Sequence, residues 1–332
     1  MHINIYITAA VSVALTAVLG YFLLPVLRAL KAGQSIRELG PTWHNNKAGT
    51  PMMGGLMFIA SAIICLLCNI PFMEDYTVFL SLALALCFGL VGFLDDFFKV
   101  KFKRNLGLTS LQKALLQMAV SAIYLYVMYK LGGLGQDGKI MLYIPFADQS
   151  FAIHPLIYIF FAMFVMVGCV NAVNITDGVD GLCGSVTTPV MVFFTAACVV
   201  LKKYDLALLP ACLVGGLIAY LFYNWHPAKV FMGDTGSLFL GGMVVGMAFA
   251  LNMPLILILV GFVYMMETVS VIIQVFYFKV THGKRFFKMA PIHHHFEMSG
   301  WKEVKIVLIF ALVTALMCGR AWLGIDWTVL PQ

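Results

Sequence analysis

The chain has 332 residues, of which 62% are hydrophobic and only 11% are charged, and its formal net charge is +6. The mean hydropathy of +0.95 lies far outside the range of soluble globular domains, which excludes a soluble enzyme or binding domain. We therefore expect an all-α integral membrane protein, because helices satisfy their own backbone hydrogen bonds inside a bilayer.

Apolar segments recur along the whole chain, each close to the roughly 20 residues that a helix needs to cross a bilayer. The ten predicted spans cover about 3–29, 52–71, 76–94, 114–132, 152–170, 185–201, 207–223, 237–252, 254–278 and 303–323. The first is too long for a cleaved signal peptide, and no segment is long enough for a separate soluble domain. Residues 1–332 are predicted to form a single polytopic membrane domain.

The basic residues are distributed unevenly between the two sets of connections. Sixteen of the 21 lysines and arginines belong to one set, and the other set holds five: Lys130, Lys139, Lys202, Lys203 and Arg320. Because cytoplasmic loops carry the excess of positive charge, this bias places both termini on the extracytoplasmic side. The basic face suits an anionic lipid or an anionic substrate.

The polar segments gather on the predicted cytoplasmic face, and we expect the active-site loops there. These loops are about 31–51, 95–113, 171–184, 224–236 and 279–302. On the other face, the longest connection, 132–150, has room for a small hairpin and carries no chemical cluster. The eight cysteines fall mostly in apolar runs and predict no disulfide framework.

Five aspartates lie on this face: Asp95, Asp96, Asp177, Asp180 and Asp234. Carboxylates without cysteine ligands suit a hard divalent cation, above all Mg²⁺. Each one alone would also be an ordinary solvated loop acid. As a set in a chain with so few acids, they predict a metal-assisted site.

Basic side chains accompany these acids. Lys99 follows the aspartate pair, Lys113 opens the next span, and Lys47 precedes the small-residue turn Gly49–Gly55. The positive-inside bias explains many basic residues on this face. The spacing around Lys47 is not that of a Walker A loop, so an ATPase is disfavoured. Carboxylates that hold Mg²⁺ beside cations are what phosphoryl transfer requires.

Five segments together resemble a known family. "HNNKAGTPMMGG", "FLDDFFK", "NAVNITDGVDGL", "FMGDTGSLFLGG" and "APIHHHFE" look like its successive signature loops. The family is the phospho-N-acetylmuramoyl-pentapeptide transferases, within the polyprenyl-phosphate N-acetylhexosamine 1-phosphate transferase superfamily. The resemblance spans about residues 35–305, in the right order. One departure is Met52, where the family usually has threonine, which puts a role for that hydroxyl in doubt.

The resemblance implies a reaction, a cofactor and partners. The implied enzyme joins the phospho-sugar of UDP-N-acetylmuramoyl-pentapeptide to undecaprenyl phosphate, gives lipid I and UMP for peptidoglycan synthesis, and depends on Mg²⁺. It would work in the bacterial cytoplasmic membrane, as a homodimer, and would bind nucleoside natural-product inhibitors. No nucleic-acid partner is expected.

The resemblance also implies roles for individual residues. Asp95, Asp96 and Asp234 match the catalytic acids, with Asp234 as the metal-site aspartate, and Asp177 looks like a nucleotide contact. The remaining implied substrate-binding residues are Lys47, Lys99, Lys103, Lys113, Asn171, Asn174, Asp180, Asn224, Phe231, Gly233, His293, His294 and His295.

Three interpretations compete for His293, His294 and His295. Consecutive side chains point in different directions, so a single zinc ion could rarely take all three. Loop histidines without a role are the plain alternative. The resemblance favours histidines that line the cytoplasmic cleft, because this triplet distinguishes the muramoyl-pentapeptide enzymes from their relatives.

Two features of the ninth predicted span remain open. Glu267 lies within its apolar run and has no assigned role, since a buried glutamate more often pairs with a polar neighbour. The length of the span suggests a tilt or a break that would open a slot for the polyprenyl chain.

Two other functions stay in view. The nearer is a polyprenyl-phosphate N-acetylglucosamine 1-phosphate transferase, which should lack "APIHHHFE". The more distant is a cation transporter, which should place its acids near the midplane and show repeated halves.

Overall fold

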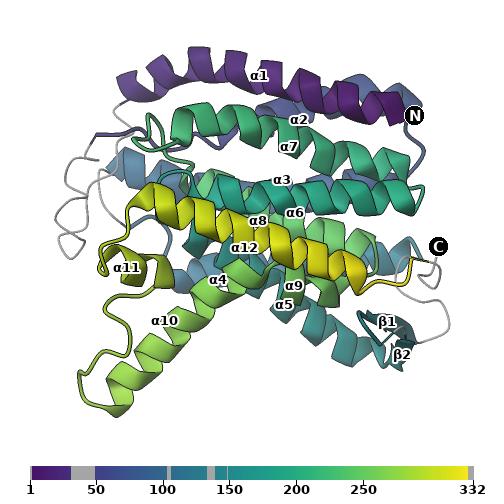
Figure 1. The fold of residues 1–332 in the computed structure, drawn as a ribbon. Coiled ribbons are helices and arrows are strands. Elements are labelled where there is room, and N and C mark those ends of the chain that lie inside the picture. The colour runs from purple at the N-terminus through teal and green to yellow at the C-terminus, as the bar shows by residue number, and fades with distance from the viewer. Residues whose placement is uncertain (1, 31–48, 103–105, 133–138, 148, 328–332) are drawn as a thin grey trace.

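The computed structural model describes residues 2–30, 49–102, 106–132, 139–147 and 149–327, and this part of the chain is almost entirely helical (Figure 1). The main helices are α1 (His2–Ala29), α2 (Leu56–Asn69), α3 (Tyr76–Phe102), α4 (Ser110–Lys130), α5 (Pro155–Thr176), α6 (Leu182–Val200), α7 (Tyr204–Asn224), α8 (Gly233–Ala250), α9 (Leu257–Val260), α10 (Phe262–Val280), α11 (Ile292–Glu297) and α12 (Glu303–Leu323). The predicted all-helical class is confirmed apart from one hairpin.

Nine helices of the described residues are long and apolar enough to cross a membrane. The exception among the ten predicted spans is α2, whose 14 residues extend about 21 Å, less than a hydrocarbon core of about 30 Å. Residues 51–55 before it form backbone bonds instead of helix, and a short 3-10 turn, Ile70–Phe72, follows it. A multi-span membrane protein is confirmed, and the count of ten stays a prediction.

The ninth predicted span is broken, not continuous. A 3-10 turn at Pro254–Ile256 leads into the single-turn α9, and Gly261 separates α9 from α10. Beyond this break α10 leaves the bundle at an angle and ends away from the other helices (Figure 1). The break suggested by the length of the apolar run is therefore present.

Helix α8 forms the centre of the bundle, and almost all of its residues are buried. It packs against α3 and α5, while α7 packs against α1 and α6. Its many small residues let neighbouring helices approach closely, as expected where lipid supplies no hydrophobic driving force between helices. Buried hydroxyls also join helices: Ser12 and Ser61 lie 3.0 Å apart, and Thr187 and Tyr264 lie 2.8 Å apart.

The two ends of the bundle differ in character. The start of α1, the end of α12 and the hairpin of β1 (Ile140–Ile144) and β2 (Gln149–Ile153) lie at one end, and α11 lies at the other (Figure 1). The strands pair antiparallel, with Ile140 opposite Ile153. This pairing confirms the small hairpin predicted for the connection around residues 132–150. Which end faces the cytoplasm stays a prediction.

Candidate active site

The aspartate pair lies within α3, which continues beyond it to Phe102. Asp95 and Lys99 are four residues apart, so both project from the same face of the helix, and their side chains form an ion pair of 2.6 Å. Lys99 also lies 3.8 Å from Asp96. The helix thus presents two acids and a lysine as one unit.

Asp96 is completely buried and caps the start of α8. One carboxylate oxygen accepts the backbone N–H of Asp234 at 3.2 Å. The other accepts the backbone N–H of Thr235 at 2.9 Å and the Thr235 hydroxyl at 2.7 Å. Gly233 has a φ of +74°, and a side chain there would overlap the Asp96 carboxylate, which explains the glycine. A negative charge at a helix N-terminus is favourable.

Asp234 is the point at which four helices meet. From the first turn of α8, its Oδ2 accepts hydrogen bonds from Lys99 on α3, at 3.0 Å, and from Lys113 on α4. Its Oδ1 accepts from the side-chain amide of Asn174 on α5 at 2.9 Å, and that amide also reaches Ser237 at 2.8 Å. The carboxylate is thereby held in one orientation.

Asp95 faces the same two lysines. Its Oδ2 lies 2.6 Å from the Lys99 ammonium and 3.5 Å from that of Lys113, and its Oδ1 accepts the backbone N–H of Leu108 at 2.8 Å. Three carboxylates therefore share two ammonium groups, which leaves the cluster with a net negative charge.

This cluster fits a divalent cation. Asp95, Asp96 and Asp234 each offer a carboxylate oxygen, and the three oxygens lie within 4.8 Å of one another. An all-oxygen donor set suits Mg²⁺ better than a softer metal. Both Asp96 oxygens are engaged by donors fixed at the start of α8, whereas Asp95 and Asp234 face lysine ammonium groups on flexible side chains, so Asp95 and Asp234 are the better candidates for direct ligands.

The loop after α5 brings Asp177 near this cluster. The side chain is half-buried, and its pKa is raised to about 8, first by burial and then by the negative charges of Asp234, Asp96 and Asp180. Asn171, one turn before Asn174, instead bonds to Gln117 on α4 at 2.7 Å. Asn171 thus joins α5 to the helix that carries Lys113.

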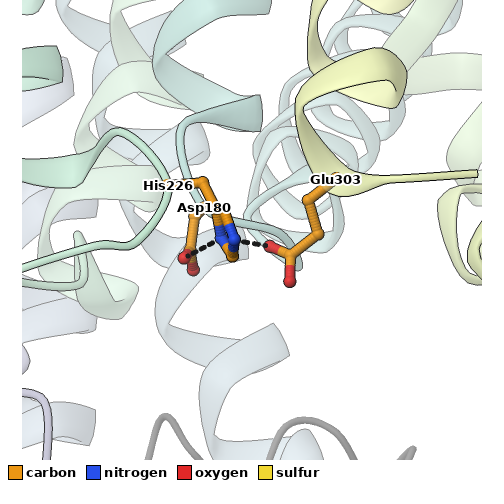
Figure 2. Close-up of side chains that lie close together, drawn as sticks. All are labelled: Asp180, His226 and Glu303. Carbon is orange, nitrogen blue, oxygen red and sulfur yellow. Dashed lines mark hydrogen bonds and ion pairs between the residues drawn. The ribbon is translucent and has the colours of Figure 1, made fainter.

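Asp180 belongs to a second cluster, shown in Figure 2. Its Oδ2 lies 3.0 Å from Nδ1 of His226 and accepts the backbone N–H of Ala228 at 3.1 Å. On the other side of the same nitrogen, Oε2 of Glu303 lies at 3.4 Å. The three side chains come from the loop after α5, the loop after α7 and the start of α12, and they too are spaced to hold a metal ion.

Backbone hydrogen bonds join two of the predicted signature loops. Phe231 donates to the carbonyl of Pro51 and accepts from Gly54, both at 2.8 Å, and Gly55 donates to Met232 at 3.0 Å. Asn224 fixes the adjoining turn by accepting from Gly181 at 3.0 Å and donating to Val230 at 2.9 Å. These bonds place Gly233 and Asp234 relative to the "GTPMMGG" segment.

Met52, the departure from the family pattern, is buried. Its side chain contributes to the core at this position, so the threonine hydroxyl of the family has no counterpart here. Lys47 and Lys103, two of the predicted substrate-binding residues, lie outside the described residues.

The three histidines form half of the short helix α11 and point to different partners. His293 is buried, with Nδ1 3.0 Å from Oε2 of Glu267. His294 bonds to Glu297 through its own Nδ1, and His295 accepts the backbone N–H of Lys288 at 3.2 Å. This divergence agrees with the argument against one zinc ion bound by all three.

Several polar partners escaped the sequence argument. Gln117, Thr235, Ser237 and His226 all bond to predicted site residues, and Glu303 pairs with His226. Gln117 lies four residues after Lys113, on the same face of α4, so helical spacing could have drawn attention to it. The others follow only from the tertiary arrangement.

The chain matches known proteins over most of its length. The family model of glycosyl transferase family 4 matches residues 78–252, which include the three clustered aspartates. A phospho-N-acetylmuramoyl-pentapeptide-transferase of Clostridium acetobutylicum is 44% identical over 325 residues, covering 98% of this chain and 100% of that protein. The chain belongs to this transferase family.

Two further phospho-N-acetylmuramoyl-pentapeptide-transferases extend the match. The protein of Carboxydothermus hydrogenoformans is 47% identical over 304 residues, with 90% of this chain and 91% of the relative covered. That of Clostridium perfringens is 46% identical over 315 residues, with 95% and 96% covered. These transferases therefore match nearly the whole length of the chain.

Proposed function

We propose that this transferase moves phospho-N-acetylmuramoyl-pentapeptide from its UDP conjugate to undecaprenyl phosphate, forming lipid I and UMP for peptidoglycan synthesis. The proposal rests on relatives of that name that match nearly the whole chain. Its strongest structural support is the meeting of Asp95, Asp234, Lys99 and Lys113 from three helices at one point.

The chemistry requires two anionic phosphate groups to approach each other. For each pair of unit charges, repulsion at 4 Å is of order 4 kcal/mol at an effective dielectric of 20. The ammonium groups of Lys99 and Lys113 lie within the aspartate cluster, and each is ion-paired to Asp234. Both lysines can therefore offset the negative charge of the reacting phosphates.

We include Mg²⁺ in the proposal, held by Asp234 and Asp95 and supported by Asp96. When bound, it would supply charge neutralisation and orientation of the diphosphate. The donor set fits, since all three residues offer carboxylate oxygen. Asn174 and the capping contact of Asp96 hold the Asp234 carboxylate and its helix in place.

The nucleophile needs little activation. A phosphate monoester has its second pKa near 6, so the lipid phosphate is mostly dianionic at neutral pH. The proposed step is a direct in-line attack by this phosphate on the phosphorus bonded to the sugar, with UMP as the leaving group. Asp95 either removes a residual proton or orients the nucleophile. A stable phospho-aspartyl enzyme would contradict this one-step scheme.

The proposal extends to the surroundings of the protein. We place it in the bacterial cytoplasmic membrane, with ten spans, both termini outside and the α11 end of the bundle facing the cytoplasm. A homodimer and nucleoside inhibitors bound beside the aspartate cluster follow from the family resemblance.

The deciding experiment measures UMP release by the purified protein in detergent, with UDP-N-acetylmuramoyl-pentapeptide and undecaprenyl phosphate, with and without Mg²⁺. UDP-N-acetylglucosamine serves as the rival donor. Release that needs the muramoyl donor, the lipid and Mg²⁺ is expected. Release only with the rival donor would move the protein to the sister family, and no release with either donor would refute the proposed function.

A further inference from the structure

Glu267 and His293 form a buried pair that the reaction described above does not use. Glu267 lies on α10, and His293 lies 26 residues later on α11. Their side chains are 0% and 1% exposed, and Nδ1 of His293 lies 3.0 Å from Oε2 of Glu267. The backbone N–H of His293 also points to this oxygen at 3.5 Å. The pair therefore joins the histidine helix to the displaced helix α10.

The remaining polar atoms of this pair are unusual. Oε1 of Glu267 and Nε2 of His293 are both buried and have no hydrogen-bond partner within the described part of the chain. A buried ionisable pair with unpartnered atoms is poor evidence for a stabilising role, since apolar side chains would fill the same space at lower cost. Such a pair is better explained by a function.

The geometry fixes how the imidazole is used. Nδ1 faces a carboxylate oxygen, which is an acceptor, so Nδ1 carries a proton whether the ring is neutral or charged. Nε2 is then the nitrogen that remains for another task. Carboxylates that hold a second nitrogen of a functional histidine commonly set its tautomer and its orientation.

The Nε2 edge of His293 faces the loop that contains Asp177. A methyl group added to Gly178 would overlap Nε2 and Cε1 of the imidazole, so the ring packs directly on the backbone at Gly178. The neighbouring ring of His294 contacts His293 edge-on, with the ring centroids 4.2 Å apart. The orientation of His293 is therefore coupled both to the Asp177 loop and to the next histidine.

We propose that Glu267 is a positioning residue of the transferase, which holds Nδ1 of His293 so that Nε2 faces the turn at Asp177 and Gly178. This proposal rests on the proposed function, and it adds a residue of α10 to a site otherwise built from α3, α4, α5 and α8. Glu267 acts through His293 and touches neither the substrates nor the reacting atoms.

The test compares Glu267→Gln, Glu267→Ala, His293→Ala and the double variant Glu267→Ala/His293→Ala in the full chain. Tyr264→Phe is the matched control, because it removes a buried hydrogen bond from the same helix, to Thr187, without touching α11. Steady-state UMP release gives kcat and KM for each donor, and thermal unfolding reports stability.

We expect Glu267→Gln to lower kcat by roughly 10- to 100-fold, as for other residues that orient a functional histidine, with KM changed less than about threefold. The double variant should have a kcat no lower than that of the less active single variant, because each substitution already disrupts the same Glu267–His293 pair. Tyr264→Phe should keep kcat. If the losses in the two single variants multiply, or if kcat falls only in proportion to folded protein, Glu267 does not act through His293.

A second measurement is independent of turnover. Nitrogen chemical shifts of ¹⁵N-histidine-labelled protein report which ring nitrogen carries the proton, and the His293 signal is assigned by its loss in His293→Ala. A protonated Nδ1 in the parent that becomes partly deprotonated in Glu267→Ala is expected. An unchanged signal would overturn the positioning role even in an active enzyme, whereas an inactive parent with the expected signal would count against the proposed function alone.

Discussion

Asp96 accepts the backbone N–H of Asp234 at 3.2 Å, so one aspartate of the α3 pair holds the helix that carries the third aspartate of the cluster. Both oxygens of Asp96 are used in this way, the second by Thr235. Asp95, one residue earlier, instead faces Lys99 and Lys113. Two adjacent acids thus have different tasks, and Asp96 works mainly by placing Asp234.

Asp96→Asn should therefore cost stability as well as activity. The amide would put one N–H group against the backbone donors of α8, and a buried donor left unpaired costs about 1–3 kcal/mol. We expect a lower unfolding temperature and a large loss of kcat. Thermal unfolding in detergent, with activity measured on the same preparation, checks both. An unfolding temperature equal to that of the parent would refute the capping role.

Asp95→Asn should lose activity and some stability, because the buried carboxylate makes a 2.6 Å ion pair with Lys99. Its bond from the Leu108 N–H can be kept by the amide oxygen, so the variant mainly removes charge. If Asp95 takes a residual proton from the nucleophile, activity should recover as the pH rises above the second phosphate pKa near 6. A pH profile of kcat for parent and variant measures this. A parallel loss at every pH would assign Asp95 to positioning or metal binding.

Mg²⁺ should stabilise the folded protein against heat. The cluster carries three carboxylates against two ammonium groups, so a divalent cation relieves a net repulsion. At a concentration 100 times its dissociation constant, a ligand adds about 2.7 kcal/mol. We expect EDTA to lower the unfolding temperature and abolish UMP release, and Mg²⁺ to restore both. Asp234→Asn should lose the thermal shift, and an undiminished shift in that variant would place the metal elsewhere.

The sequence predicted the helices and the individual site residues better than the contacts between those residues. Apolar length identifies most spans, and α12 matches its predicted range of 303–323, because hydrophobicity alone determines a lipid-facing helix. The length of the apolar run suggested a break but did not place it at Gly261, because its position depends on how α9 and α10 pack. The pairing of Glu267 with His293 joins positions 26 residues apart, and that of His226 with Glu303 joins positions farther apart still. No local pattern encodes such contacts.

The raised pKa of Asp177 makes the ionised side chain unfavourable for folding. The pKa of about 8 in the folded state exceeds the value near 3.9 of an exposed aspartate, so folding disfavours the ionised form. This penalty is absent below about pH 4, grows as the pH rises, and is complete above about pH 8.

Asp177→Asn removes this penalty. In EDTA at pH 8 we expect the variant to be more stable than the parent by about 1–2 kcal/mol, less than the full pKa shift implies because solvent reaches part of the side chain. Near pH 5 the difference should shrink. Thermal unfolding at both pH values measures it, and a variant less stable than the parent at pH 8 would contradict the prediction.

Gly178→Ala should disturb the contact between the Asp177 loop and His293. The added methyl group would overlap the imidazole, and overpacking of this kind costs about 1–3 kcal/mol. We expect a lower unfolding temperature together with a fall in kcat, because the ring must move.

Gly168→Ala is the matched control, since a methyl group there meets no atom within 4 Å and the residue lies in the interior of α5. The control should retain activity and gain slightly in stability, because alanine favours a helix interior by about 1 kcal/mol over glycine. Equal behaviour of the two variants in both assays would mean that His293 is free to leave the loop without consequence for the reaction.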